Sequence, residues 1–72
     1  MISDEIIFEV REDEAEGGFV AHALGHSIVT QAETWSELRQ SVRDAVLCHF
    51  EPGDVPRVIR LHRVQDEVLA TA

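Results

Sequence analysis

Residues 34–50 read TWSELRQSVRDAVLCHF, a stretch that carries both the start signal and the periodicity of an amphipathic helix. Thr34 and Glu37 have the spacing of a capping box, in which each side chain accepts a hydrogen bond from a backbone N–H left unpaired at the helix start. Pro52 and Gly53 then end the helix. Apolar residues and one histidine recur at helical spacing and predict a stripe that packs on a sheet: Trp35, Leu38, Val42, Ala45, Val46, His49 and Phe50.

Three segments before this helix have the pattern of β-strands. Residues 5–11 alternate between apolar and polar positions, residues 19–24 alternate between two faces, and residues 27–31 are rich in β-branched side chains. A polar loop that ends in Gly17 and Gly18 joins the first two strands, because glycine readily adopts the positive φ that a chain reversal needs. The pattern predicts an antiparallel meander of three strands.

A fourth strand is predicted after the helix, at residues 57–64, where Ile59 and Leu61 alternate with Val58, Arg60 and His62. The expected architecture is therefore α+β in the order βββαβ, with one antiparallel sheet, one amphipathic helix packed on it, and a single domain over residues 1–72. Residues 65–72 are too few for a second domain, and we expect them to form a frayed helical turn or a disordered tail.

The composition is that of a small globular domain, with 44% hydrophobic and 28% charged residues in a chain of 72. A core of this size supplies only a few kcal/mol of net stability, so burial of further apolar surface against a second copy or another protein is favourable. We therefore expect a homodimer or a higher oligomer. The 14 acidic residues against six arginines and no lysine give a net charge of −8, which disfavours free nucleic acid and favours a basic protein partner.

Half of the acidic residues lie in the first 16 positions. A run of like charges is most simply a solvated surface. The functional alternative is a surface that attracts a basic partner, and the candidate partner-binding residues are Glu9, Glu12, Asp13, Glu14 and Glu16.

A locally basic stretch occurs in the last predicted strand, where three arginines fall within seven residues. Charges of this kind often protect an edge strand from unwanted pairing, and that is the simpler interpretation. The alternative is an RNA-binding patch, extended by two helical arginines one turn apart if the sheet brings the strand near that flank of the helix. The residues of this candidate patch are Arg39, Arg43, Arg57, Arg60 and Arg63.

Catalytic and metal-binding chemistry is not indicated by the sequence. His22 and His26 have the spacing of helical metal ligands, but they are predicted in a strand and in a turn, and no third ligand is apparent. Cys48 and His49 are helical neighbours whose side chains point about 100° apart. We expect no metal, no cofactor and no enzymatic activity. The lone cysteine and the lack of a leader or a membrane-length apolar segment predict a cytoplasmic protein without membrane contact.

The pattern of strands and capped helix resembles the HicB-like antitoxin domain, a sheet-and-helix module also called a partial RNase H fold. The resemblance is carried by residues 18–31, GFVAHALGHSIVTQ, in which a strand leads through a glycine to a Thr-Gln segment. It continues in residues 32–46, AETWSELRQSVRDAV, with the capping threonine and the apolar stripe in place. It covers about residues 5–64.

This resemblance implies the antitoxin of a type II toxin–antitoxin system, a protein that binds and neutralises a small basic ribonuclease toxin. It also implies dimerisation through sheet and helix surfaces. Family members usually add a C-terminal DNA-binding segment, but only eight residues follow Val64 in this chain, so we expect a stand-alone relative that does not bind DNA. Residues 24–27, LGHS, replace the family's proline-rich turn. The alternative to an antitoxin is therefore an oligomeric domain of the same fold without an antitoxin role.

Overall fold

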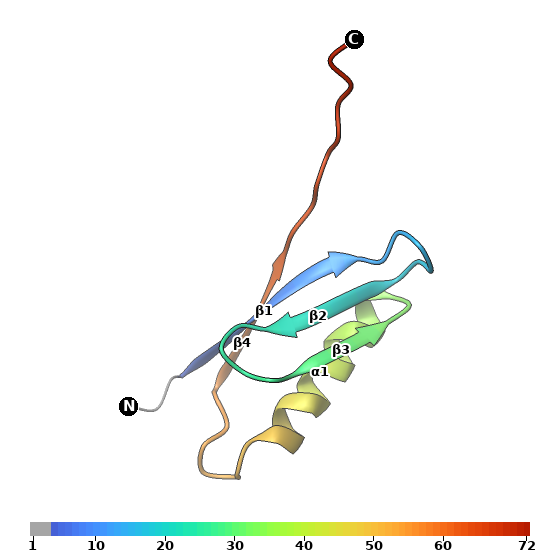
Figure 1. The fold of residues 1–72 in the computed structure, drawn as a ribbon. Helices are drawn as coiled ribbons and strands as arrows, with labels where there is room; N and C mark the ends of the chain where they lie inside the picture. Colours follow the sequence, from blue (N-terminus) through green and yellow to red (C-terminus); the bar gives the residue numbers. More distant parts are fainter. Residues whose placement is uncertain (1–3) are drawn as a thin grey trace.

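The computed structural model describes residues 4–72 and shows four strands and one helix (Figure 1). The elements follow the predicted order βββαβ, and each begins and ends within two residues of the predicted limits. They are β1 (Glu5–Glu12), β2 (Phe19–Ala23), β3 (Val29–Ala32), α1 (Trp35–His49) and β4 (Val58–Arg63). The α+β class is therefore confirmed.

The strands form one sheet in the order β3-β2-β1-β4. Pairs β1–β2 and β2–β3 are antiparallel, so the predicted meander is confirmed, but β4 lies beside β1 and runs parallel to it. The prediction of a wholly antiparallel sheet is thus wrong. The chain between β3 and β4, which includes α1, acts as a crossover connection and returns the chain to the end of the sheet where β1 begins.

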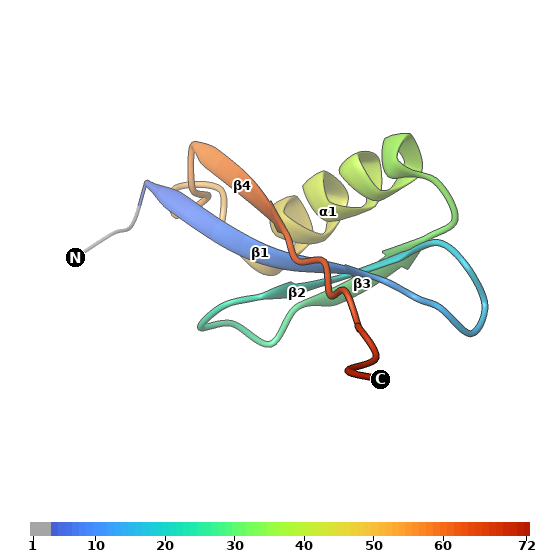
Figure 2. The same ribbon diagram turned by 90° about the horizontal axis from the view of Figure 1, so that it is seen from above.

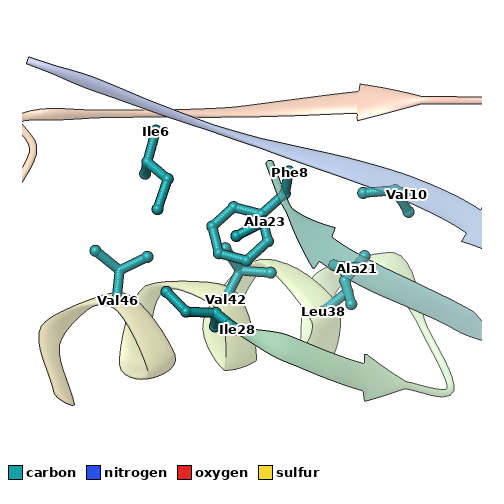
Figure 3. Close-up of a cluster of buried hydrophobic side chains, with 9 residues drawn as sticks. All are labelled: Ile6, Phe8, Val10, Ala21, Ala23, Ile28, Leu38, Val42 and Val46. Carbon is teal, nitrogen blue, oxygen red and sulfur yellow. The ribbon is translucent and has the colours of Figure 1, made fainter. Parts of the chain in front are cut away.

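The core lies between α1 and one face of the sheet. Ile6, Phe8 and Val10 of β1 are at most 2% exposed, and they meet the buried helical residues Leu38 and Val42 (Figure 3). Four smaller side chains complete the cluster: Ala21, Ala23, Ile28 and Val46. The two alanines belong to β2, and their small size lets the helix approach the sheet closely. The alternation that predicted β1 is therefore confirmed as a buried face.

The helical stripe is confirmed except at its end. Trp35, Ala45 and Phe50 pack against the core, but His49 is exposed. His49 is the last residue of α1, where its ring lies against His26 and Phe50 instead of the sheet. At the other end, the Thr34 hydroxyl accepts a hydrogen bond from the Glu37 backbone N–H at 3.1 Å, which confirms the predicted cap.

Residues 64–72 form neither the predicted helical turn nor a further strand of the sheet. The Val64 N–H donates to the Val10 carbonyl oxygen at 2.8 Å, and the chain then runs on in the direction of β4, away from the sheet (Figure 1). Within residues 4–72, α1 is the only helix, and it is too short to cross a membrane. Figure 2 shows α1 on one side of the sheet, so the other face carries no helix.

Candidate protein-binding groove

A groove with a volume of about 620 Å³ lies between the β1–β2 loop, the end of β3 and the first turns of α1. The three elements meet there because the β1–β2 hairpin ends beside the β3–α1 connection. The lining residues come from all three elements: Asp13, Glu16, Gly17, Phe19, Gln31, Ala32, Glu33, Glu37, Gln40 and Ser41. We call this site the acidic groove.

Carboxylates dominate the charge of the acidic groove. Four of its lining residues are acidic and none is basic, and no cation within residues 4–72 forms an ion pair with these four: Asp13, Glu16, Glu33 and Glu37. Phe19 and Ala32 add apolar surface to the lining. This combination suits an arginine or lysine side chain, because its charged head can reach carboxylates while its aliphatic stem covers apolar surface.

The loop that carries Asp13 and Glu16 is fixed by its own hydrogen bonds. The Asp13 carboxylate accepts from the backbone N–H groups of Ala15 and Glu16 at 3.1 and 3.3 Å. The Asp13 N–H also donates to the Gly18 carbonyl oxygen at 3.0 Å, and the Gly17 N–H donates to the Asp13 carbonyl oxygen at 2.8 Å. The loop therefore holds the Asp13 carboxylate in place at the wall of the groove.

Gly18 brings this loop against the β3–α1 connection. Its φ is +82°, and a Cβ atom at this position would lie 2.5 Å from the backbone carbonyl oxygen of Ala32. No real side chain tolerates that approach to backbone, so only glycine allows the two segments to touch here. This contact joins the two walls of the acidic groove.

The five acidic residues singled out from the sequence are divided by the structure. Asp13 and Glu16 line the acidic groove. Glu9 is paired with Arg11 at 2.9 Å, and Glu12 is paired with Arg63 at 2.9 Å, so both belong to intramolecular ion pairs. Glu14 lines a different depression.

Glu33 and Glu37 complete the groove and were missed by sequence reasoning. Glu37 was recognised only as part of the capping box, and no local pattern links either residue to a loop some 20 positions earlier. The available signal was their position around Thr34, because acidic side chains near a helix N-terminus interact favourably with its dipole.

The arginines in β4 and directly before it do not form an open basic patch. Arg57 pairs with Asp4 at 2.7 Å, Arg60 pairs with Glu5, and Arg63 pairs with Glu12. The hydrogen bond to Glu5 and the attraction of its charge raise the pKa of the Arg60 guanidinium. Each cation of the strand is thus neutralised by a carboxylate next to or within β1.

Arg63 lies on the α1 side of the sheet. Its guanidinium carbon is 5.2 Å from the ring centroid of Phe19 and 5.3 Å from that of Trp35. The two rings are in an edge-to-face arrangement with centroids 5.3 Å apart. The helical residues Arg39 and Arg43 form no ion pair within residues 4–72 and stand apart from these contacts.

The candidate histidines lie in different surroundings. His22 is an exposed residue of β2, whereas His26 lies in the β2–β3 turn with its ring centroid 5.9 Å from that of His49. No three metal-ligating side chains within residues 4–72 are grouped so that they could hold an ion. Cys48 is exposed on α1.

Comparison with known proteins gives two similar chains. A UPF0150 protein of Archaeoglobus fulgidus is 51% identical over 55 residues, which cover 76% of this chain and 80% of the relative. A UPF0150 protein of Thermotoga maritima is 39% identical over 66 residues, which cover 92% of this chain and 91% of the relative. The chain belongs to the UPF0150 family. No protein-family model matches this UPF0150 chain, and no solved structure matches it significantly.

The UPF0150 chain has a second, smaller depression at the end of β4. Its lining residues include two arginines and three carboxylates: Arg11, Glu12, Glu14, Arg63, Val64, Gln65 and Asp66. Arg63 is paired with Glu12, and Arg11 is also 3.5 Å from Asp66. Because its charges are largely balanced internally, this depression is a weaker candidate for binding a charged partner than the acidic groove.

Proposed function

We propose that this UPF0150 protein is a non-catalytic protein-binding module of the cytoplasm that captures a basic partner in its acidic groove. In this proposal it acts like the antitoxin of a type II toxin–antitoxin system and neutralises a basic ribonuclease toxin or a similar protein. The observation that carries the proposal is the distribution of charge. Arg57 and the two arginines of β4 are paired with carboxylates of residues 4–12, whereas the four carboxylates of the groove have no cationic partner within residues 4–72.

Binding is favoured over catalysis by the kinds of side chain in the groove. The lining residues include one hydroxyl, that of Ser41, and no histidine or cysteine that could act on it as a base or serve as a nucleophile. Carboxylates in the groove can instead receive a guanidinium or ammonium group of a partner. Such charges mainly raise the association rate, and the buried apolar contacts supply most of the affinity.

RNA binding receives less support from the geometry. Of the five arginines considered for that function, three are engaged in ion pairs, so Arg39 and Arg43 are left to contact phosphate. Two cations on a chain with a net charge of −8 provide little of the counterion release that drives binding to nucleic acid.

The test is the binding of a fluorescein-labelled octa-arginine peptide, measured by anisotropy in 50 mM salt. The double variant Glu33→Gln, Glu37→Gln removes two groove carboxylates and keeps a residue type that suits the capping box. We expect its Kd to rise about tenfold, which corresponds to about 1.4 kcal/mol. The matched control is Glu51→Gln, Glu67→Gln, which makes the same change in net charge at exposed positions outside the groove.

If the control lowers affinity as much as the groove variant does, the peptide responds to net charge alone and the groove has no specific role. The antitoxin part of the proposal needs a further experiment with native lysate. A small basic ribonuclease that the wild-type chain retains and inhibits, and that the groove variant does not, is the expected result. Retention of the same ribonuclease by both proteins contradicts the proposal.

A further inference from the structure

The outer edge of β4 is unpaired within residues 4–72. β4 has β1 as its single neighbour in the sheet. The Val58 N–H donates to the Asp4 carbonyl oxygen, and the Val64 N–H donates to the Val10 carbonyl oxygen. The even-numbered residues of the strand therefore direct their backbone N–H and C=O groups toward β1. By this alternation, Ile59, Leu61 and Arg63 direct their backbone N–H and C=O groups outward.

This edge lacks the usual protection against pairing. Charged side chains can guard an edge strand when they project from it. Here Arg60 and Arg63 reach back to Glu5 and Glu12 of β1. The chain after the strand leaves the edge open too, because residues 64–72 continue in the direction of β4 and do not fold back along it (Figure 1).

The ends of the strand carry apolar residues at equal distances from Leu61, which are Val58 and Val64. Residues 58–64 read VIRLHRV. In an antiparallel pair of two such strands centred on Leu61, the two leucines lie opposite each other on the α1 side, and on the same side each Ile59 lies opposite Arg63 of the second copy. On the other face, Val58 lies opposite Val64 of the second copy, and Arg60 lies opposite His62 and not opposite another arginine. Cross-strand apolar pairs of this kind stabilise a sheet.

We propose that β4 pairs antiparallel with β4 of a second copy around a two-fold axis at Leu61, which joins two sheets into one. The outward N–H and C=O groups of both strands are then satisfied, and the contact closes because the same surface serves both partners. A second copy suits this edge because the register sets Leu61 opposite Leu61 and Val58 opposite Val64, which are three apolar pairs in one contact. The proposal is independent of the acidic groove, which lies at the β3 side of the sheet.

The first test is the mass of the protein in solution, measured by sedimentation equilibrium between 1 and 500 μM. We expect wild type to approach twice its chain mass of 8.1 kDa. The Val58→Lys variant should weaken dimerisation at least tenfold, because it replaces one apolar partner on each side of the axis. The monomer tolerates this change, since Val58 is 48% exposed and lies beside Glu5. Val29→Lys is the matched control at the other edge, where Val29 is 64% exposed.

A wild type that stays monomeric at all concentrations overturns the proposal. A dimer that survives Val58→Lys, or that is lost with Val29→Lys instead, also overturns it. The octa-arginine assay reports on the groove separately, so failure of the dimer and failure of the proposed function are distinguishable.

The second test examines the register of the two strands. Directly opposed, hydrogen-bonded residues have Cα atoms about 5.5 Å apart, a separation that a disulfide can span. Leu61→Cys in a Cys48→Ser background should therefore form a disulfide-linked dimer under mild oxidation, whereas Val29→Cys in the same background should not. To avoid reliance on the half-buried position 61, the exposed variants Arg60→Cys and His62→Cys can be mixed. They should cross-link to each other faster than either does to itself, and a random distribution of cross-links refutes this register.

Discussion

Replacement of Gly18 by alanine tests the contact between the β1–β2 loop and the β3–α1 connection. A new Cβ would lie 2.5 Å from the Ala32 carbonyl oxygen, and the backbone φ of +82° is one that alanine adopts only with strain. The strain costs about 1–2 kcal/mol. Relief of the clash by movement of backbone adds about 1–3 kcal/mol, the usual cost of forcing an extra methyl group into a packed site. Loss of flexibility in the unfolded chain offsets about 0.4–1 kcal/mol.

The expected net loss in the free energy of unfolding is about 1–5 kcal/mol for Gly18→Ala, with a midpoint of about 3 kcal/mol, which is a large part of the stability of a domain of this size. Gly17 is a matched control, because its φ is +78° and a Cβ there has no atom within 4 Å. Gly17→Ala incurs the strain but no clash, so we expect a loss of about 1 kcal/mol.

Urea unfolding measured by tryptophan fluorescence gives both values. Trp35 is the one tryptophan, and it packs edge-to-face against Phe19 at the start of β2, so its emission reports on this part of the fold. Both variants are compared at one low protein concentration to keep association from contributing. If the two losses agree within about 0.5 kcal/mol, the close contact at Gly18 does not exist and the groove is not held together as described.

Substitutions at three further positions test the core, the helix cap and the ring contacts. Phe8→Ala removes a fully buried side chain and should cost about 3–5 kcal/mol, so that cooperative thermal unfolding by circular dichroism is no longer seen. Thr34→Ala should lower the free energy of unfolding by about 1 kcal/mol and Thr34→Ser should restore most of it; equal losses would exclude a role for the hydroxyl. Arg63→Lys keeps a charge near Glu12 but loses the flat guanidinium over the two rings, so Trp35 emission should shift while the urea midpoint falls by an amount equivalent to about 0.5–1 kcal/mol. An unchanged emission spectrum would show that the guanidinium does not stack in solution.

The elements were predictable because their signals are local. The alternation of Ile6, Phe8 and Val10 and the capping threonine at position 34 lie within single segments, and the structure confirms both. The direction of β4 was not predictable in this way. An alternating strand carries no mark of its polarity, and the parallel pairing with β1 follows from the path of the crossover.

The candidate site was predictable only in part for the same reason. Charge density identified Asp13 and Glu16, but it could not show that Glu33 and Glu37 face them, because their proximity depends on the hairpin meeting the helix start. Charge density also suggested a basic patch on the last strand. Parallel pairing instead sets Arg60 and Arg63 of β4 beside the carboxylates of Glu5 and Glu12 in β1, and this pairing of charges can be seen only once the register of the two strands is known.

The strand order β3-β2-β1-β4 has a consequence for how strongly the protein can hold a partner. The acidic groove belongs to the β3 side and the free edge belongs to β4, so two chains joined at β4 would carry their grooves at opposite ends of a continuous sheet. Such an assembly is bivalent. A partner with two basic segments, or a partner that is itself a dimer, could engage both grooves at once, and avidity would then raise the apparent affinity by about 10²–10⁴ without any new contact.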